Sequence, residues 1–169
     1  MCKMEVIEVI MAIATAAMAI ATFWLVFESR QASFRQIGVQ TWLELERRFD
    51  SQEMKTARKN LARHMKAYDP KKHSKISETV LNFFESIGIA HQERCLNNKL
   101  ADSSFSFYAC RWWEAVKPYV DQERKRQGDD DSMFEDFENF ANAMRRPDEK
   151  IDDLNLQRFL DDEEKLALD

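Results

Sequence analysis

Residues Val9 to Phe27, VIMAIATAAMAIATFWLVF, form an apolar segment that contains no charged side chain. The segment has 19 positions. Because an α-helix rises about 1.5 Å per residue, it would reach roughly 28 Å, close to the ~30 Å hydrocarbon core of a bilayer. The chain as a whole has 169 residues, of which 33% are charged. We therefore predict that the segment is a transmembrane helix and that residues 1–29 form an N-terminal membrane anchor.

Two other interpretations of this segment are open. A cleaved signal peptide has a basic start, an apolar core of about 7–15 residues and a small-residue cleavage site. The sequences AIA at 12–14 and AMA at 17–19 fit such a site, whereas the acidic Glu5 and Glu8 and the long apolar core do not. A buried helix of a soluble domain would usually show a polar stripe. The length and the flanks of the segment favour the anchor.

The charges that flank the segment predict its orientation. Lys3 alone precedes it, and the arginines that follow it are Arg30, Arg35, Arg47 and Arg48. Because positive charge is retained on the cytoplasmic side, we expect a single-pass protein with a cytoplasmic C-terminal body. Indole rings and cations are favoured where the membrane meets water. The predicted interfacial anchors are Trp24, Arg30 and Arg35.

Alanines form two ribbons on the predicted span. At about 100° per residue, the ribbons are Ala12, Ala16 and Ala19 on one side and Ala14, Ala17 and Ala21 on the nearly opposite side. Small residues let membrane helices approach closely, so the ribbons predict contact with a membrane protein or with further copies of this chain. The alternative is that alanine is simply frequent in weakly hydrophobic anchors, and both interpretations are open.

The rest of the chain predicts an all-α body. Glycine and proline number three each, and runs of alternating polarity that would indicate strands are missing. Apolar residues recur at helical spacing from the anchor to about Phe49 and then in several further segments. We expect the anchor helix to continue into a cytoplasmic bundle of four to six helices over residues 30–147. Gly88 marks a bend or a point of close packing within it.

Polar residues before the apolar repeats predict where helices begin. The predicted N-caps are Asp50, with Glu53 as its capping-box partner, then Ser74 or Ser77, and then Ser103 or Ser104. Pro118 should kink or loosen the fourth helix, because proline cannot donate a helical hydrogen bond.

The charge is unevenly distributed along the chain. Residues 148–169 hold nine acids against three bases, a net charge of −6, whereas residues 30–73 hold eleven bases against five acids, a net charge of +6. This acidic C-terminal tail either folds back on the basic segment or stays in solvent. Solvated charge on helix faces is the simplest interpretation, and a basic segment beside the span would also favour an anionic leaflet.

No catalytic, metal-binding or cofactor motif is found in the sequence. His91 and Cys95 are spaced to share a metal on one helix face, with Cys110 as a third ligand, but no supporting motif accompanies them. Both cysteines are therefore predicted to be buried thiols in a reducing compartment. A glycine-rich phosphate loop is missing, and the acidic chain disfavours nucleic acid. We expect no metal, no cofactor and no enzymatic activity.

Three blocks of sequence carry a resemblance to a known family. They are W-x-E-x-x-x-R-F-D-S-x-E-M at 42–54 with Arg58 after it, VLNFFE at 80–85 before Gly88, and WWEAVKPY at 112–119. In this combination the chain resembles a family of uncharacterised bacterial proteins, a domain of unknown function, over roughly residues 20–145. The resemblance implies an N-terminal membrane helix, a small all-helical cytoplasmic domain and a location in the bacterial inner membrane. It implies no activity and no site residues.

These observations lead to two principal hypotheses about function. The first is a membrane-anchored, non-enzymatic interaction or scaffold protein, with an accessory subunit of a membrane complex as a close variant. Its partners would be the lipid bilayer and a membrane protein or a second copy, bound through the transmembrane helix. The alternative is an oligomeric single-span channel or sensor, with Thr15 and Thr22 facing the pore. An enzyme is a third class, which the missing motifs disfavour.

Overall fold

The computed structural model describes residues 3–72, 75–96, 98–147 and 150–167. Within these ranges, the side chains of residues 3–10, 12–13, 30–36 and 98 lie outside the description. All regular secondary structure in the described ranges is helical. The predicted all-α class is therefore confirmed.

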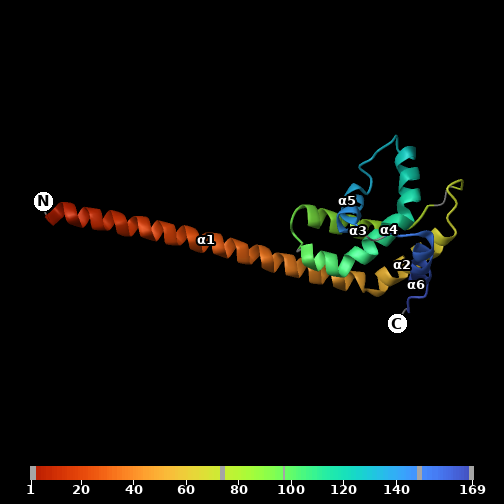
Figure 1. The fold of residues 1–169 in the computed structure, drawn as a ribbon, viewed down its shortest axis with the longest axis horizontal. Helices are drawn as coiled ribbons and strands as arrows, with labels where there is room; N and C mark the ends of the chain where they lie inside the picture. Colours follow the sequence, from red (N-terminus) through yellow and green to blue (C-terminus); the bar gives the residue numbers. More distant parts are fainter. Residues whose placement is uncertain (1–2, 73–74, 97, 148–149, 168–169) are drawn as a thin grey trace. The chain divides into compact units, whose positions relative to one another are not determined.

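The chain divides into two compact units, residues 1–37 and residues 38–169, which are called unit 1 and unit 2 below. Helix α1, Lys3–Phe49, is assigned without a break and confirms the helix predicted to continue to Phe49 (Figure 1). Among the residues that the structure describes, no helix combines the length and apolarity that crossing a bilayer requires.

Unit 2 is built from the last turns of α1 and from the helices that follow it. These are α2 (Gln52–Lys66), α3 (Thr79–Gln92), α4 (Asn98–Arg126), α5 (Glu135–Met144) and α6 (Asp153–Glu164). Helix α3 packs against α5, α2 packs against α6, and α4 contacts α3, α5 and α6 (Figure 1). Two helix pairs therefore share α4 as their common neighbour.

The first predicted helix start lies one residue from the observed one. Helix α2 is capped by Ser51, whose Oγ accepts a hydrogen bond of 3.2 Å from the backbone N–H of Met54. Asp50 was the predicted cap, but its own N–H still donates to the carbonyl of Glu46, 3.0 Å away. Asp50 therefore continues the hydrogen bonding of α1, and the next residue takes the extended conformation of a cap.

The predicted starts of the next two helices are wrong. Helix α3 begins after Glu78, and Ser77 instead lies 3.0 Å from the Thr79 hydroxyl; Ser74 lies outside the described residues. Helix α4 already begins at Asn98, so Ser103 and Ser104 lie inside it. Serine can cap a helix but can equally bond elsewhere, and local sequence does not decide between these uses.

Ser104 forms hydrogen bonds with α1 instead of capping a helix. Its Oγ accepts a 3.0 Å hydrogen bond from Trp42 Nε1 and donates a 3.2 Å bond to Glu46 Oε1. Both partners lie in the last turns of α1, within unit 2. The serine therefore ties α4 to α1.

Aromatic side chains form the centre of the core of unit 2. The ring of Phe49, at the end of α1, lies 4.8 Å from Tyr108, 5.5 Å from Phe83 and 5.8 Å from Phe105, measured between centroids. Such pairs contribute about 0.5–1.5 kcal/mol each beyond their buried area. Since these partners come from α3 and α4, they fix the end of α1 against both helices.

Gly88 lies where α3 meets α5. A Cβ atom at this position would stand 2.2 Å from the backbone oxygen of Asp136. Of the two predicted roles, close packing is the one observed, because only a residue without a side chain allows this approach. Pro118 lies inside α4, which continues to Arg126 and changes direction along its length in Figure 1.

Candidate functional site

The predicted contact alanines lie on α1. Five of them are exposed: Ala14, Ala16, Ala17, Ala19 and Ala21. The side chain of Ala12 lies outside the description. Because the backbone is helical throughout this stretch, the 100° spacing places the alanines in the two predicted ribbons. Whether a partner contacts them stays a prediction.

The predicted interfacial anchors can be located only in part. The Trp24 side chain is 67% exposed on α1. The side chains of Arg30 and Arg35 lie outside the described ones, although their backbone belongs to α1.

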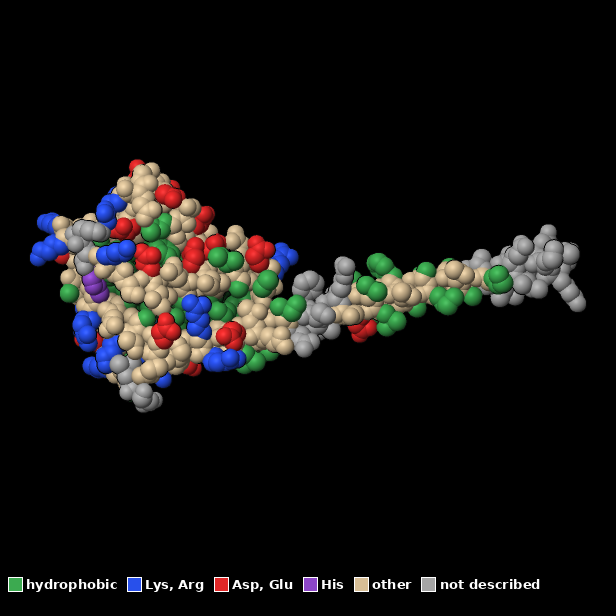
Figure 2. All heavy atoms as spheres, turned by 180° about the vertical axis from the view of Figure 1, so that it is seen from behind, with side chains coloured by type: hydrophobic (Ala, Val, Ile, Leu, Met, Phe, Trp, Pro, Cys, Tyr) green, Lys and Arg blue, Asp and Glu red, His purple; other side chains and the backbone are tan. Residues whose placement is uncertain are grey.

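Bulky apolar side chains surround the described part of α1 in unit 1. The exposed fractions lie between 51% and 74% for Met18, Ile20, Phe23, Trp24, Leu25 and Val26. At 100° per residue their positions are spread over the whole circumference of the helix, and Figure 2 shows apolar side chains along this described stretch. A helix that is apolar on every side is normally buried in protein or in lipid.

Two threonine hydroxyls within the apolar segment are satisfied by their own helix. Thr15 Oγ1 donates to the carbonyl of Met11, and Thr22 Oγ1 donates to the carbonyl of Met18, each at 2.8 Å. Bonds of this kind let a hydroxyl lie in an apolar medium without an external acceptor. These two threonines therefore add no support to the channel hypothesis.

A buried ion pair joins α2 to α6 in unit 2. Arg58 donates from Nε to Glu163 Oε2 at 2.7 Å and from Nη2 to Oε1 at 2.6 Å, and both residues are at most 4% exposed. The Arg58 guanidinium also lies over the rings of Phe49, at 4.0 Å, and Tyr108, at 5.0 Å. A planar guanidinium serves both contacts at once, which an ammonium does not.

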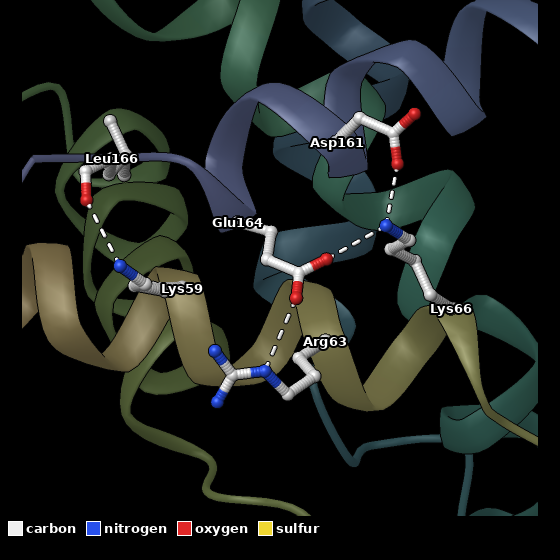
Figure 3. A network of polar contacts seen from close by, with 6 residues as sticks. All are labelled: Lys59, Arg63, Lys66, Asp161, Glu164 and Leu166. Carbon is white, nitrogen blue, oxygen red and sulfur yellow. Dashed lines mark hydrogen bonds and ion pairs between the residues drawn. The ribbon is translucent and has the colours of Figure 1, made fainter.

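Further ion pairs between α2 and α6 are more exposed than this buried one. Lys66 Nζ lies 2.6 Å from Asp161 Oδ1 and 2.8 Å from Glu164 Oε2, and Arg63 Nε lies 3.3 Å from Glu164 Oε1 (Figure 3). Lys59 adds a 3.4 Å hydrogen bond to the carbonyl of Leu166. The described part of the acidic segment therefore folds back on basic α2, one of the two predicted alternatives.

These contacts make the docking of α6 sensitive to pH. Hydrogen bonds from Lys66 lower the pKa values of Asp161 and Glu164. A carboxyl group whose pKa is lowered by folding contributes stability above its ordinary pKa and loses that contribution as the pH falls through the lowered value. Acid conditions should therefore weaken the contact between α2 and α6.

Among the cavities that open on the described surface of unit 2, two are large enough to consider as sites. One, of about 380 Å³, lies beside the buried ion pair and is lined by residues that include Arg58, Arg111, Phe107 and Phe159. The larger, of about 700 Å³, lies between α3 and α5. Neither cavity brings together a nucleophile and a base in an arrangement that would define a reaction.

The candidate metal ligands are not brought together. Helix α3 ends at Gln92, so Cys95 does not share a helix face with His91. Cys95 is exposed, which corrects the prediction of a buried thiol, whereas Cys110 is buried and its Sγ donates to the carbonyl of Ala141 at 3.3 Å. Within the described residues, no group of three potential metal ligands occurs.

Glu85 caps α5 from the neighbouring helix α3. Its Oε2 accepts a 2.7 Å hydrogen bond from the N–H of Phe137, in the first turn of α5. Phe134, at the start of that helix, has a φ of 56° and makes no side-chain cap, so Glu85 supplies one from α3. Burial raises the pKa of this carboxyl. No local signal indicates such a cap, because its two partners are far apart in the sequence.

Comparison with known proteins identifies one family. A family model described as a domain of unknown function, DUF4760, matches residues 9–144. No curated protein and no solved structure matches the chain. Helix α6 lies beyond the matched residues. Because the match covers most of the chain, this protein belongs to the DUF4760 family, whose function is unknown.

Proposed function

We propose that this protein is a membrane-anchored, non-enzymatic helical interaction protein. Residues 9–27 would cross a membrane once, and unit 2 would bind a partner on the cytoplasmic side. The observation that carries the proposal is the ring of bulky, exposed apolar side chains on α1, within a segment of 19 residues that lacks charge. A bacterial origin and location belong to the same proposal.

The energetic argument concerns what must cover these side chains. Burying one large apolar side chain contributes about 1.5–3 kcal/mol, so several such residues facing water would carry a large unfavourable free energy. Exposed apolar surface of this kind indicates a membrane or protein contact. A lipid bilayer covers every side of a helix at once, which matches the distribution around α1.

The alanine ribbons suggest how the span would contribute to assembly. Where Ala16 and Ala19, or Ala17 and Ala21, face a neighbour, two helices could pack closely. The neighbour would be another membrane protein, with this chain as its accessory subunit, or a second copy. The non-enzymatic part of the proposal rests on the absence of catalytic motifs from the sequence.

Membrane extraction tests the anchor directly. We expect the full chain to remain in the membrane fraction after a high-salt alkaline wash and to be released by detergent. A double variant with Met18→Arg and Ile20→Arg should be released from the membrane, because each arginine near the centre of a span raises the free energy of membrane insertion by about 2.5–3.5 kcal/mol. Leu154→Arg is a matched control, since Leu154 is 60% exposed in unit 2. Release of the wild type by the wash alone would refute the anchor.

Cysteine labelling tests the orientation. In a Cys2→Ser variant, the exposed Cys95 is accessible to a membrane-impermeant thiol reagent, whereas Cys110 is buried. We expect labelling in inside-out vesicles and protection in right-side-out vesicles. The reverse pattern would place unit 2 on the outer side and contradict the proposed orientation.

The mass of the purified assembly tests the ribbons. In mild detergent we expect a stable complex with another membrane protein or a homo-oligomer. The variant carrying Ala16→Ile and Ala19→Ile should lose that complex while remaining in the membrane. An unchanged mass would show that this ribbon is not a contact surface.

A further inference from the structure

Helix α6 is held on unit 2 chiefly by charge. Helix α2 carries five Lys or Arg residues against one acid, and α6 carries five acids against one Arg. The described ion pairs between them use Arg58, which pairs with Glu163, together with Arg63 and Lys66. Figure 3 shows the pairs of Arg63 and Lys66. The apolar part of the contact is small, because Phe159 and Leu160 are the buried hydrophobic residues of α6. The pair of Arg58 with Glu163 is buried, whereas the ion pairs of Arg63 and Lys66 are more exposed and are therefore individually weak.

The fit between α6 and the surface beneath it is incomplete. Phe159 packs edge-on against the Trp112 ring, with 5.2 Å between centroids. The buried indole Nε1 of Trp112 nevertheless has no hydrogen-bond partner within the described part of the chain. The cavity of about 380 Å³ also lies beside Phe159 and Arg58. A buried donor without an acceptor is unfavourable. A different helix that offers an acceptor to this indole could therefore bind the surface more tightly than α6 does.

We propose that the surface beneath α6 is a helix-docking site that α6 occupies within the same chain. The docking site comprises Arg58 and Lys66 of α2 and Tyr108 and Trp112 of α4. Its partner is an acidic amphipathic helix of another protein, which displaces α6. The proposal rests on the proposed function, in which unit 2 is an interaction module.

The bound α6 defines the chemistry of the partner. An aromatic residue would take the place of Phe159 against Trp112. A carboxylate four residues later would take the place of Glu163 and form the two hydrogen bonds with Arg58. A further carboxylate would pair with Lys66, as Asp161 does. Positions four residues apart lie on one face of a helix, so one short segment can supply the aromatic and acidic anchors.

Competition with α6 of the same chain favours a membrane protein as the partner. Because α6 belongs to the same chain, its effective concentration at the site is on the order of millimolar, so a dilute partner competes poorly. Confinement to the same membrane raises the local concentration of the partner. The location of the protein would thereby control whether the site is open.

The test uses the full chain in detergent and a fluorescent peptide with the sequence of residues 150–167. In the chain, Asp161→Lys and Glu164→Lys place positive charges opposite Lys66 while retaining Phe159 and Glu163, which are buried. This variant should bind the peptide at least about tenfold more tightly than the wild type does, because losing the ion pairs of Asp161 and Glu164 lowers the fraction of molecules in which α6 occupies the site. The same peptide with both lysine changes is the control and should not bind.

Two results would overturn the proposal. One is equal binding of the peptide to wild type and variant, provided that circular dichroism shows the variant to be folded. If the variant unfolds, hydrogen exchange of the wild type decides: α6 should exchange before α3, through local opening. Exchange of α6 only together with α3 would also overturn the proposal. Because the peptide-binding assay does not depend on a bilayer, a negative result would not count against the proposed membrane anchor.

A second peptide identifies the occupant. It retains Phe159, Asp161, Glu163 and Glu164 but carries Asn155→Ala and Gln157→Ala. Binding of this peptide supports a partner that is recognised by its acidic and aromatic pattern. Binding restricted to the authentic sequence, together with dimerisation of the charge-reversed chain, would identify a second copy as the occupant and overturn the proposed partner.

Discussion

Replacing Gly88 with alanine should force α5 away from α3. The added Cβ would stand 2.2 Å from the oxygen and 2.5 Å from the carbonyl carbon of Asp136, both backbone atoms that no side-chain rotation can move. An ordinary contact begins near 3.4 Å, so the two helices would have to separate by about 1.2 Å. Densely packed interiors resist such a shift.

The expected loss of stability follows from the contacts at this crossing. Overpacking alone costs about 1–3 kcal/mol. The separation would also disturb the stacked Phe84 and Phe137 rings, 5.0 Å apart, and the hydrogen bond from Phe137 to Glu85, each worth about 1 kcal/mol. The higher helix propensity of alanine relative to glycine offsets about 1 kcal/mol of this destabilisation. The net destabilisation should be about 2–4 kcal/mol, a large fraction of the ~5–15 kcal/mol that stabilises a typical domain.

Urea unfolding followed by tryptophan fluorescence measures this loss. Trp113 is a suitable reporter, because its ring lies 5.2 Å from Phe137 on α5. Gly128→Ala is the matched control: Gly128 has a φ of +89° and no atom within 4 Å of an added Cβ. It should lose about 1 kcal/mol through backbone strain alone. A Gly88→Ala protein as stable as this control, or more stable than wild type, would refute the close approach.

Four further predictions concern unit 2. Glu163→Leu alone should destabilise it by about 3–5 kcal/mol by stranding Arg58, whereas combining it with Arg58→Met should restore most of the loss; additive effects in a double-mutant cycle of urea unfolding would contradict this. Glu85→Ala should cost about 1 kcal/mol through the lost helix cap. Burial raises the pKa of Glu85, so the contribution of Glu85 to stability falls as the pH rises through that pKa. In thermal melts, the melting temperature of Glu85→Gln should therefore increase relative to that of wild type as the pH is raised from acid to neutral. A relative increase on lowering the pH instead would contradict the inferred sign. Arg94→Gly should stabilise by about 0.5–1 kcal/mol, because Arg94 has a φ of 56°; a lower melting temperature would show that its side chain matters.

The all-α class and the continuity of α1 to Phe49 followed from the sequence, because the spacing of apolar residues along a helix is a local property. The role of Gly88 was predictable for a related reason, since a glycine within an apolar helical repeat indicates close approach or a bend. The arrangement of the alanine ribbons likewise needs only a helical backbone. The partner that they would face does not follow from their spacing.

The tertiary structure determined the hydrogen-bond and ion-pair partners of the polar side chains. Ser51 rather than Asp50 caps α2, and Ser104 bonds to α1 instead of starting a helix. The pairing of Arg58 with Glu163, 105 positions away, and the cap from Glu85 to α5 have no local signature. Apolar periodicity is set by neighbours along the chain, whereas a polar side chain takes whichever partner folding brings within hydrogen-bonding distance. The sequence alone therefore determined the helices, and only the packing of unit 2 determined that α6 covers the basic face of α2.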